Sequence, residues 1–253
     1  MSAKSAMLAV VPAYNEAGSV AQVISALRER APEFDVIVID DGSTDNTAEC
    51  ARAAGAAVIR LPFNLGIGGA VQTGFVYARE HGYDYMAQVD GDAQHEPAEL
   101  RRLLETMQAD PSLDMVCGSR FISAEQTYEA SLTRRTGIRL FAFVLSKILR
   151  QRITDPTSGF RLYNRKAIGL FARDYPHDYP EVEAVLMLHA HRLRMTEVAV
   201  RMHSRGSGSS SITTMRSAYY MIKVSLALLV GLMRRRTVVD AGGPAPISAT
   251  RSL

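Results

Sequence analysis

Apolar and polar positions along the first half of the chain follow a regular order of short apolar runs and longer amphipathic stretches. The apolar runs predict strands over 6–11, 36–39, 58–61, 85–89 and 115–117. Between them, apolar residues recur every three or four positions, which predicts helices over 20–27, 45–54, 68–80 and 97–108. Because these strands are apolar nearly throughout and alternate with helices, we expect an α/β fold with a mostly parallel sheet covered on both faces.

The second half of the chain has a less regular pattern. We expect a helix over 132–149, a polar turn over 154–161 before a short apolar run, a helix over 181–191 and a strand over 196–202. A Gly/Ser loop over 204–211 follows. An apolar segment over 218–233 is interrupted by a lysine and ends in three arginines, and the Gly- and Pro-containing tail after it predicts disorder. The pattern therefore predicts one α/β domain over 1–211, an amphipathic helix over 212–236 and a disordered tail over 237–253.

Composition adds a charge asymmetry to this picture. The chain of 253 residues carries a formal net charge of +3. Its last part, from Arg201 onward, holds eight Lys/Arg and only Asp240 as an acid, so an anionic surface or ligand is expected there. The two cysteines, Cys50 and Cys117, form no CxxC pattern, and the sequence shows no signal peptide, so we expect a cytosolic protein.

The most informative polar cluster is Asp90-Gly91-Asp92-Ala93-Gln94, directly after the predicted strand over 85–89. Side chains two positions apart in an extended chain point to the same side, so both carboxylates face one region. Such clustered charge is costly in a poorly solvated place unless a cation lies there. Mg²⁺ or Mn²⁺ carrying a diphosphate fits, because these cations take carboxylate, phosphate and water oxygens. Acidic turn residues at a strand end are the alternative explanation.

Two further polar clusters follow predicted strands, and they lie at 12–16 and 40–43. In a parallel sheet the carboxyl ends of the strands form one edge, where ligands bind. Tyr14 offers a ring for stacking on a nucleobase, Glu16 offers an acceptor, and Asp41 could hold a nucleotide through hydrogen bonds. A strand exit, a turn and a helix cap would explain the same residues without a ligand.

Several other classes of site are disfavoured by the sequence. Gly66-Ile67-Gly68 lacks the third glycine of a dinucleotide-binding motif, because Val71 stands there, and no GxxxxGK[ST] phosphate loop occurs. The histidines form no metal-binding pattern. No aromatic-rich basic platform accompanies the arginines, so we expect no nucleic acid partner.

Taken together, the motifs resemble those of the family 2 glycosyltransferases with a GT-A fold, most closely the dolichyl-phosphate mannose synthase-like branch. The resemblance spans about 7–211. The motifs that carry it are Val11-Pro12-Ala13-Tyr14-Asn15-Glu16, Asp40-Asp41-Gly42-Ser43-Thr44-Asp45, Asn64-x-Gly66-x-x-x-Ala70, Asp90-Gly91-Asp92-Ala93-Gln94, Gly118-Ser119-Arg120, Asp155-x-Thr157-Ser158-Gly159-Phe160-Arg161 and Glu197-Val198-x-Val200-x-x-x-Ser204-Arg205.

The resemblance implies a GT-A-type Rossmann-like sandwich that transfers a sugar, with inversion, from a nucleotide-diphosphate sugar. Carried over by position, the residues that would bind the nucleotide sugar are Pro12, Tyr14, Glu16, Asp41 and Asp90. The implied metal ligands are Asp92 and Gln94, and Asp92 is also counted as catalytic. Mg²⁺ or Mn²⁺ at this place would neutralise charge that develops on the departing diphosphate.

The branch also implies an acceptor, a polyprenyl phosphate. Guanidinium groups match phosphate geometry, so the candidate phosphate-binding residues are Arg120, Arg134, Arg135 and Arg205. Arg205 is also counted as catalytic. Each could instead be a solvated surface charge. An ionised phosphate needs no strong general base, whereas a sugar hydroxyl would need one, and Asp155 or Glu183 would then serve. Asp155 could instead only organise its turn, and Glu183 could only cap its helix.

Membrane contact is the last expectation from the sequence. The segment over 218–233 has 16 residues, fewer than the ~20 that span a bilayer. It could be a core helix or an interfacial helix with its basic residues on anionic lipid. Members of the resembled family often carry transmembrane helices that this chain lacks. We therefore expect a peripheral protein at the cytosolic face of a membrane, with or without a small membrane protein partner.

Three alternatives remain open on the sequence alone. A lipid-linked saccharide or a cell-surface polysaccharide could replace the polyprenyl phosphate as acceptor. A sugar nucleotidyltransferase would share the fold class and acidic metal ligands, but it should carry a basic Gly-rich loop where this chain has Pro12-Ala13-Tyr14-Asn15-Glu16. A non-catalytic nucleotide-sugar sensor is the third alternative, and for such a protein Asp92→Asn would leave the cellular function intact. The nucleobase and the sugar cannot be inferred from these residues.

Overall fold

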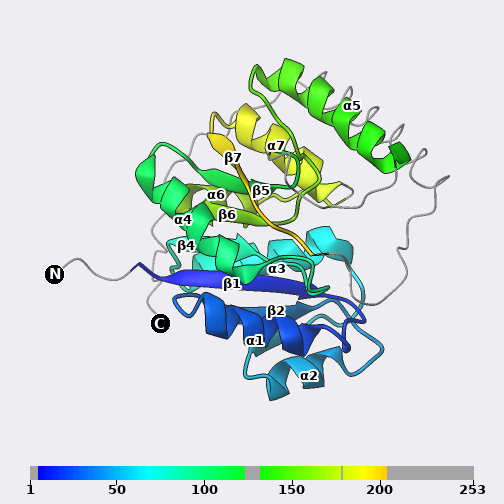
Figure 1. Ribbon diagram of the computed structural model, residues 1–253. Coiled ribbons are helices and arrows are strands. Elements are labelled where there is room, and N and C mark those ends of the chain that lie inside the picture. Colours follow the sequence, from blue (N-terminus) through cyan, green and yellow to red (C-terminus); the bar gives the residue numbers. More distant parts are fainter. Residues whose placement is uncertain (1–4, 123–131, 178, 204–253) are drawn as a thin grey trace, which may run out of the picture.

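A single sheet organises the computed structural model, which describes residues 5–122, 132–177 and 179–203 (Figure 1). Its strands lie in the order β3-β2-β1-β4-β6-β5-β7. They are β1 (Met7–Ala13), β2 (Asp35–Asp40), β3 (Ala57–Arg60), β4 (Tyr85–Gln88), β5 (Met115–Ser119), β6 (Arg161–Asn164) and β7 (Met195–Ala199). Neighbouring strands are parallel except at β6, which is antiparallel to both β4 and β5. The predicted α/β fold with a mostly parallel sheet is confirmed.

The helices occupy the connections that the hydrophobic pattern predicted. They are α1 (Val20–Arg30), α2 (Thr47–Ala53), α3 (Gly66–Glu80), α4 (Leu100–Ala109), α5 (Leu132–Leu149), α6 (Arg165–Phe171) and α7 (Pro180–Ala190), and a 3₁₀ turn η1 (Pro97–Glu99) precedes α4. The pattern did not predict α6, because its seven residues are too few to establish a helical period. The sequence nevertheless provides a cap for the start of α6, because the Asn164 side chain accepts a hydrogen bond from Ala167 N at 3.0 Å.

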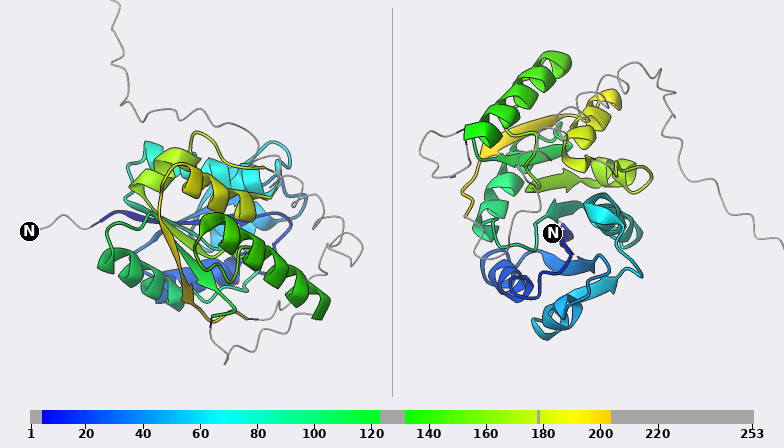
Figure 2. Two further views of the ribbon diagram at one scale, coloured as in Figure 1. Left: turned by 90° about the horizontal axis from the view of Figure 1, so that it is seen from above. Right: turned by 90° about the vertical axis from the view of Figure 1, so that its right-hand side faces the viewer.

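Helices cover both faces of the sheet (Figure 2). On one face, Leu8 and Val10 of β1 pack in a core with residues of α3, α5, α6 and α7. On the other, Ala9 and Val11 pack with residues of α1, α2 and α4. Successive side chains of a strand point to opposite faces, so a strand covered on both sides must be apolar at every position. This explains why β1 is a continuous apolar run and is buried throughout.

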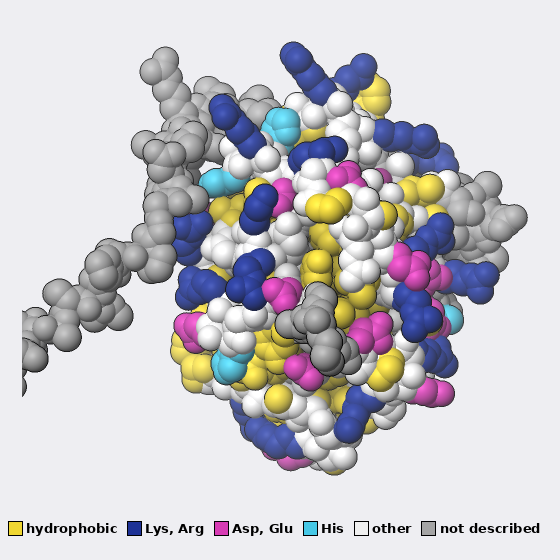
Figure 3. Space-filling model, turned by 90° about the vertical axis from the view of Figure 1, so that its left-hand side faces the viewer, with side chains coloured by type: hydrophobic (Ala, Val, Ile, Leu, Met, Phe, Trp, Pro, Cys, Tyr) yellow, Lys and Arg dark blue, Asp and Glu magenta, His cyan; other side chains and the backbone are white. Residues whose placement is uncertain are grey.

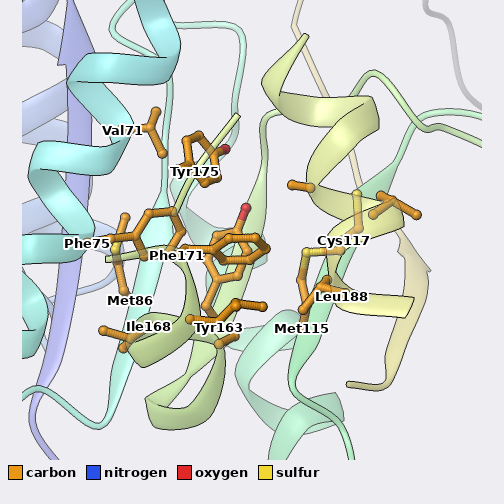
Figure 4. Packing of buried hydrophobic residues seen from close by; sticks show 14 of the residues in the cluster. Val71, Phe75, Met86, Met115, Cys117, Tyr163, Ile168, Phe171, Tyr175 and Leu188 are labelled. Carbon is orange, nitrogen blue, oxygen red and sulfur yellow. The ribbon is translucent and has the colours of Figure 1, made fainter. Parts of the chain in front are cut away.

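An aromatic cluster fills the first of these cores. Phe75 of α3 lies 4.9 Å from Tyr163 of β6 and 5.1 Å from Phe171 of α6, measured between ring centroids (Figure 4). Tyr175 stacks at 5.2 Å from both phenylalanine rings. Such edge-on and tilted pairs add to the apolar burial and join α3 to the antiparallel strand. The two halves of the sheet are thus held at a fixed distance from each other.

The carboxyl ends of β1, β2 and β4 meet at one edge of the sheet, as expected for parallel neighbours. The register pairs Ala13 with Asp40 and Val10 with Gln88, so the polar clusters after these strands start at similar heights. Within the part of the chain that the structure describes, no helix is long and apolar enough to cross a membrane. The helix predicted over 212–236 and the tail over 237–253 lie outside the described residues.

Candidate active site

The loops after β1 and β2 are joined by reciprocal hydrogen bonds. Asn15 has a left-handed backbone, with φ of 55°, and its side-chain oxygen accepts from Thr44 N at 2.9 Å. Its own N–H donates to Ser43 Oγ at 2.9 Å. Further along, Glu16 N donates to Thr47 Oγ1 and Ala17 N donates to Asp45 Oδ2. These bonds fix both loops as one wall before any ligand binds.

Asp40 and Asp41 are both buried at the end of β2, but they have different partners. Asp40 Oδ1 accepts from Ser43 N at 3.0 Å, and Oδ2 lies 3.3 Å from Arg60 Nε. Asp41 Oδ1 accepts from Leu65 N at 2.7 Å, at the start of α3. Burial raises the pKa of Asp41, and the N–H groups of Leu65 and Gly66 oppose this effect. Asp40 therefore shapes the turn, while Asp41 joins the β2 end to the loop before α3.

The other candidate nucleotide-binding residues line the same wall. Pro12 is buried in β1 and pairs with Ile39 in the register. Tyr14 follows β1 and is 46% exposed, which is an unusual position for a tyrosine ring and leaves it accessible for stacking. Glu16 accepts from Ser19 Oγ at 2.8 Å through Oε2. The structure thus brings Pro12, Tyr14, Glu16 and Asp41 to one end of β1 and β2.

The Asp90-to-Gln94 segment forms a tight turn directly after β4. Asp92 Oδ1 accepts from Gln94 N at 3.1 Å, and Ala93 between them has a left-handed φ of 60°. Asp90 keeps 36% of its side chain exposed, and Asp92 and Gln94 are half-buried. The turn directs three oxygen-bearing side chains toward the carboxyl edge of the sheet, where a ligand can reach them.

His95 supports this turn from behind. It is buried against Phe160, with ring centroids 4.8 Å apart, and its Nδ1 accepts from Asp90 N at 3.1 Å. Burial lowers the pKa of His95, although Asp90 and Asp92 act in the opposite direction. The neutral ring that burial favours can accept the backbone N–H of Asp90 and so holds the first residue of the turn.

The donor set of this turn fits a hard divalent cation. Two carboxylates and an amide oxygen are the ligand types that Mg²⁺ and Mn²⁺ take, and Asp92 and Gln94 are the residues that would hold the ion. Among the described residues, no group of three His, Cys, Asp or Glu could hold a metal ion. A cation here would therefore complete its shell with oxygens of the bound ligand and water, as Mg²⁺ commonly does at diphosphates.

Gly159 brings the second half of the chain against the same carboxylate. A Cβ at this position would lie 2.9 Å from Asp90 Oδ2 and 3.1 Å from Gln88 Nε2. Gln88 is the last residue of β4 and is almost fully buried, 2% exposed. The glycine is needed because the turn before β6 passes directly over the Asp90 side chain. Asp90 is thus in contact with both halves of the molecule.

Arg120 and Asp155, predicted separately as phosphate ligand and catalytic residue, are brought together in a buried ion pair. Arg120 Nε donates to Asp155 Oδ2 at 2.7 Å, and Nη2 donates to Oδ1 at 2.8 Å. The backbone N–H of Arg120 also donates to Oδ2, and Nη2 donates to Thr157 Oγ1. Asp155 is fully buried and Arg120 is 7% exposed. This bidentate geometry connects the end of β5 to the turn before β6.

A second carboxylate, that of Glu197 in β7, accepts hydrogen bonds from the same turn. Its oxygens accept from Thr154 N at 2.7 Å, Thr154 Oγ1 at 2.6 Å and Asp155 N at 3.0 Å. Burial raises the pKa of Glu197, and the hydrogen bonds from Thr154 and Asp155 oppose it. The turn over 154–158 is therefore fixed by β5, β7 and its own residues together.

The structure describes the remaining candidate residues only in part. Arg134 and Arg135 belong to the first turns of α5, and their side chains are not described. Arg205 lies outside the described residues, two positions beyond His203. Glu183 is half-buried in the first turn of α7 and has an interaction partner.

The sequence assigned no role to three residues that contribute to this site, although Gly159 and Glu197 stand in motifs that carry the family resemblance. The acid at Glu197 carries a signal that could have been used, because a carboxylate in a strand needs hydrogen-bond partners when it is buried. The role of Gly159 depends on its contact with Asp90, which lies 69 positions away in the sequence. Glu181 begins α7, where its carbonyl oxygen accepts from Arg161 Nη2 at 2.7 Å. Burial raises the pKa of Glu181, and the charge of Arg161 opposes this effect.

A mostly parallel α/β sheet with an Asp-x-Asp turn at its carboxyl edge is the arrangement expected of a GT-A-type glycosyltransferase. Comparison with known proteins agrees. The family model described as Glycosyl transferase family 2 matches residues 8–170, and the chain belongs to this family. It is therefore a glycosyltransferase.

Curated relatives and solved structures extend this assignment. The chain is 30% identical over 215 residues to an undecaprenyl-phosphate mannosyltransferase of Micrococcus luteus, covering 82% of this chain and 87% of the relative. It is 26% identical to a UDP-N-acetylglucosamine–dolichyl-phosphate N-acetylglucosaminyltransferase of Methanococcus voltae, covering 76% and 83%. Glucosyl-3-phosphoglycerate synthase from Mycobacterium tuberculosis, solved with Mn²⁺, UDP and glucosyl-3-phosphoglycerate, has the same fold at 20% identity, with a TM-score of 0.67 and coverage of 90% and 80%.

Proposed function

We propose that this chain transfers a sugar, with inversion, from a nucleoside diphosphate sugar to a polyprenyl phosphate, with Mg²⁺ or Mn²⁺ as cofactor. The observation that carries the proposal is the Asp90-to-Gln94 turn, whose partly exposed carboxylates lie beside the wall formed by the β1 and β2 loops. The acceptor class rests on relatives that align with most of the chain and are an undecaprenyl-phosphate and a dolichyl-phosphate glycosyltransferase. Those relatives use different sugars, so the donor sugar stays open.

On the donor side, each residue has a distinct role. Tyr14 stacks on the nucleobase, while Pro12, Glu16 and Asp41 hold the nucleoside. Asp92 and Gln94 would hold the divalent cation, which would supply positive charge to the departing diphosphate. Asp90 orients the sugar, since its side chain is held against Gly159. In the reaction, an acceptor phosphate oxygen forms a bond to the anomeric carbon from the face opposite the leaving group. The bond from that carbon to the diphosphate oxygen breaks, and the nucleoside diphosphate departs.

On the acceptor side, the nucleophile carries its own charge. A phosphate monoester is ionised at neutral pH, so no side chain has to remove a proton. We propose that Arg134, Arg135 and Arg205 bind this phosphate. We propose that Arg120 contributes to the same phosphate while its Nε and Nη2 donate to Asp155 and Thr157. We propose for Asp155 that it acts in catalysis through Arg120, by holding it at the edge of the site.

The localisation we propose is peripheral, at the cytosolic face of a membrane, with or without a small membrane protein partner. Among the described residues, α5 offers a suitable surface. The residues from 132 to 154 include six basic residues and no acid. Phe143 is 60% exposed, and Lys147 Nζ lies 5.6 Å from its ring centroid. Figure 3 shows the left-hand side of the view in Figure 1, and Lys and Arg side chains are frequent at the top of this face too. Basic residues around an exposed aromatic ring favour anionic lipid.

The acceptor proposal is tested by donor turnover with short polyprenyl phosphates and with oligosaccharides, in the presence of Mn²⁺. We first select the donor by thermal stabilisation with UDP and GDP, because a tight ligand raises the melting temperature. We expect turnover with the polyprenyl phosphate and none with the saccharide. Turnover with the saccharide alone would identify a polysaccharide-extending enzyme, and pyrophosphate release from a nucleoside triphosphate would identify a nucleotidyltransferase.

The membrane proposal is tested by sedimentation with vesicles of phosphatidylglycerol and of phosphatidylcholine. We expect binding to the anionic vesicles, weakened by salt. The double variant Lys147→Glu/Phe143→Ser should reduce this binding at least about tenfold, since each basic residue near the surface contributes about 1 kcal/mol. Arg101→Glu on α4 is the matched control. Equal binding by the double variant and the wild type would exclude α5 as the docking surface.

A further inference from the structure

The segment that follows β7 pairs with the segment that follows the proposed metal ligands. His95 and Met202 form an antiparallel bridge. His203 N donates to Gln94 O at 2.8 Å, and Arg201 N donates to Glu99 Oε1 at 3.4 Å. This pairing joins the chain directly after Asp92 and Gln94 to a strand end about a hundred residues later in sequence.

Glu96 reinforces the pairing through its side chain. Both of its carboxylate oxygens accept from Arg30 Nη1, at 2.7 and 2.8 Å, and Oε2 lies 3.0 Å from His203 Nε2. Its side chain is only 15% exposed, whereas those of Arg30 and His203 are 47% and 59% exposed. Hydrogen bonds from Arg30 and His203 outweigh the effect of partial burial and keep the pKa of Glu96 below its usual value. One carboxylate thus connects the end of α1, the segment after β4 and the segment after β7.

The position of this link matters for the two substrates. Gln94, whose carbonyl receives the His203 N–H, is a proposed metal ligand on the donor side. Arg205, a proposed acceptor ligand, follows His203 by two residues, and two residues span at most about 7 Å of chain. Glu96 itself touches neither substrate in any proposed role. Its contacts instead determine how firmly the His203 backbone is held against Gln94.

We infer that Glu96 is a positioning residue that couples nucleotide and metal binding at Asp92 and Gln94 to the backbone over 201–203, and through it to the acceptor side. The inference rests on the proposed donor site. When the donor side becomes ordered by its ligand, the paired segment becomes ordered with it, and the reverse must hold to the same degree because coupling between two binding sites is reciprocal. Loss of the Glu96 carboxylate would leave each segment in place but uncouple them.

Hydrogen–deuterium exchange of the full-length chain tests this directly. The readout is amide exchange in peptides covering 198–203, with and without Mn²⁺ plus UDP or GDP, whichever stabilises the protein. In the wild type, we expect the nucleotide and Mn²⁺ to slow exchange of the His203 amide at least about fivefold, the lower range of measured couplings between sites. Glu96→Ala should abolish this slowing, and Glu96→Gln, which keeps one acceptor oxygen, should retain part of it.

Arg165→Gln is the matched control, because it removes an exposed ion pair of the same 2.7 Å length, to Asp84, outside both sites. A second readout is kinetic: Glu96→Ala should raise the KM for a short polyprenyl phosphate more than the KM for the donor, with the melting temperature close to that of the control. If nucleotide slows exchange equally in the wild type and Glu96→Ala, the coupling is overturned while the donor site stands. If neither nucleotide stabilises the protein, the donor proposal fails, and the coupling fails with it.

Discussion

The carboxyl edge of the sheet carries two groups of carboxylates that differ in how their charge is compensated. On the β5–β7 side, Asp155 is fully buried and Glu197 is half-buried, and backbone and side-chain donors bind the oxygens of both. Asp90 and Asp92, on the β4 side, lie in a tight turn and remain partly exposed. Groups of the protein itself supply the hydrogen-bond donors for the first pair of carboxylates. The second pair stays accessible, so that a ligand can approach it.

The difference separates a structural use of charge from a functional one. A buried carboxylate is tolerated only with hydrogen-bonded partners, and such a network fixes the backbone that carries it. Partly exposed carboxylates held two residues apart gain stability when a cation arrives. Gly159 directly follows the turn over 154–158 that the first group holds, and it lies against the Asp90 side chain of the second group, so that turn positions Asp90.

The largest effect should come from the buried group. Asp155→Asn leaves the Arg120 guanidinium buried without its carboxylate, and breaking such a pair costs about 3–5 kcal/mol of unfolding free energy. Urea denaturation followed by circular dichroism measures the loss. Arg165→Gln, which breaks an exposed pair, should cost less than about 1 kcal/mol. A loss below that of the control would show that the pair does not hold the turn.

Removing a charge from the open group should affect activity and not stability. Asp92→Asn keeps the size of the side chain but removes its charge. We expect at least a ~100-fold loss of kcat/KM, because a weakly bound cation no longer neutralises the charge that develops on the departing diphosphate. The unfolding free energy should change by less than about 1 kcal/mol. Asp110→Asn, at an exposed carboxylate, should leave activity unchanged. Full activity of Asp92→Asn would exclude a metal ligand at Asp92 on which catalysis depends.

Gly159 tests the contact between the two groups. In Gly159→Ala, the new methyl group would lie within 3.0 Å of both Asp90 oxygens, so the carboxylate must move. Because the flexible side chain can yield, we expect only a small loss of stability but about a tenfold loss in kcat/KM, equivalent to about 1.4 kcal/mol. Steady-state kinetics with varied donor measures this. If the variant instead loses stability and keeps its kcat/KM, Gly159 serves packing alone.

The smallest expected effect is a difference in thiol reactivity between Cys50 and Cys117. Cys117 on β5 is buried, which raises the pKa of its thiol to about 12, whereas Cys50 on α2 is partly exposed. We expect a thiol reagent at pH 8 to modify Cys50 in the native protein and Cys117 only after unfolding. Mass spectrometry of native and urea-treated protein counts the modified thiols. Rapid native labelling of Cys117 would mean that the β5 side opens readily.

The sequence determined the order of the elements, because each strand and helix leaves a local periodicity that needs no knowledge of its neighbours. The continuous apolar runs at β1 and β2 predicted strands covered on both faces, and the acidic clusters after them predicted the edge that binds ligands. The same reasoning brought Asp90, Asp92 and Gln94 together, since they are close in sequence. The sequence did not predict α6, and it showed β6 only as a short apolar run.

Tertiary structure decided what depends on residues far apart in the chain. The pairing of Arg120 with Asp155, the contact of Gly159 with Asp90 and the link from Glu96 to His203 each join segments separated by 35 or more positions. Local patterns cannot encode these contacts, because whether a charge is a buried partner or an exposed ligand depends on which surface packs against it. The sequence thus specified the chemistry available at the sheet edge, and the packing of β5, β6 and β7 determined which of those charges stayed open.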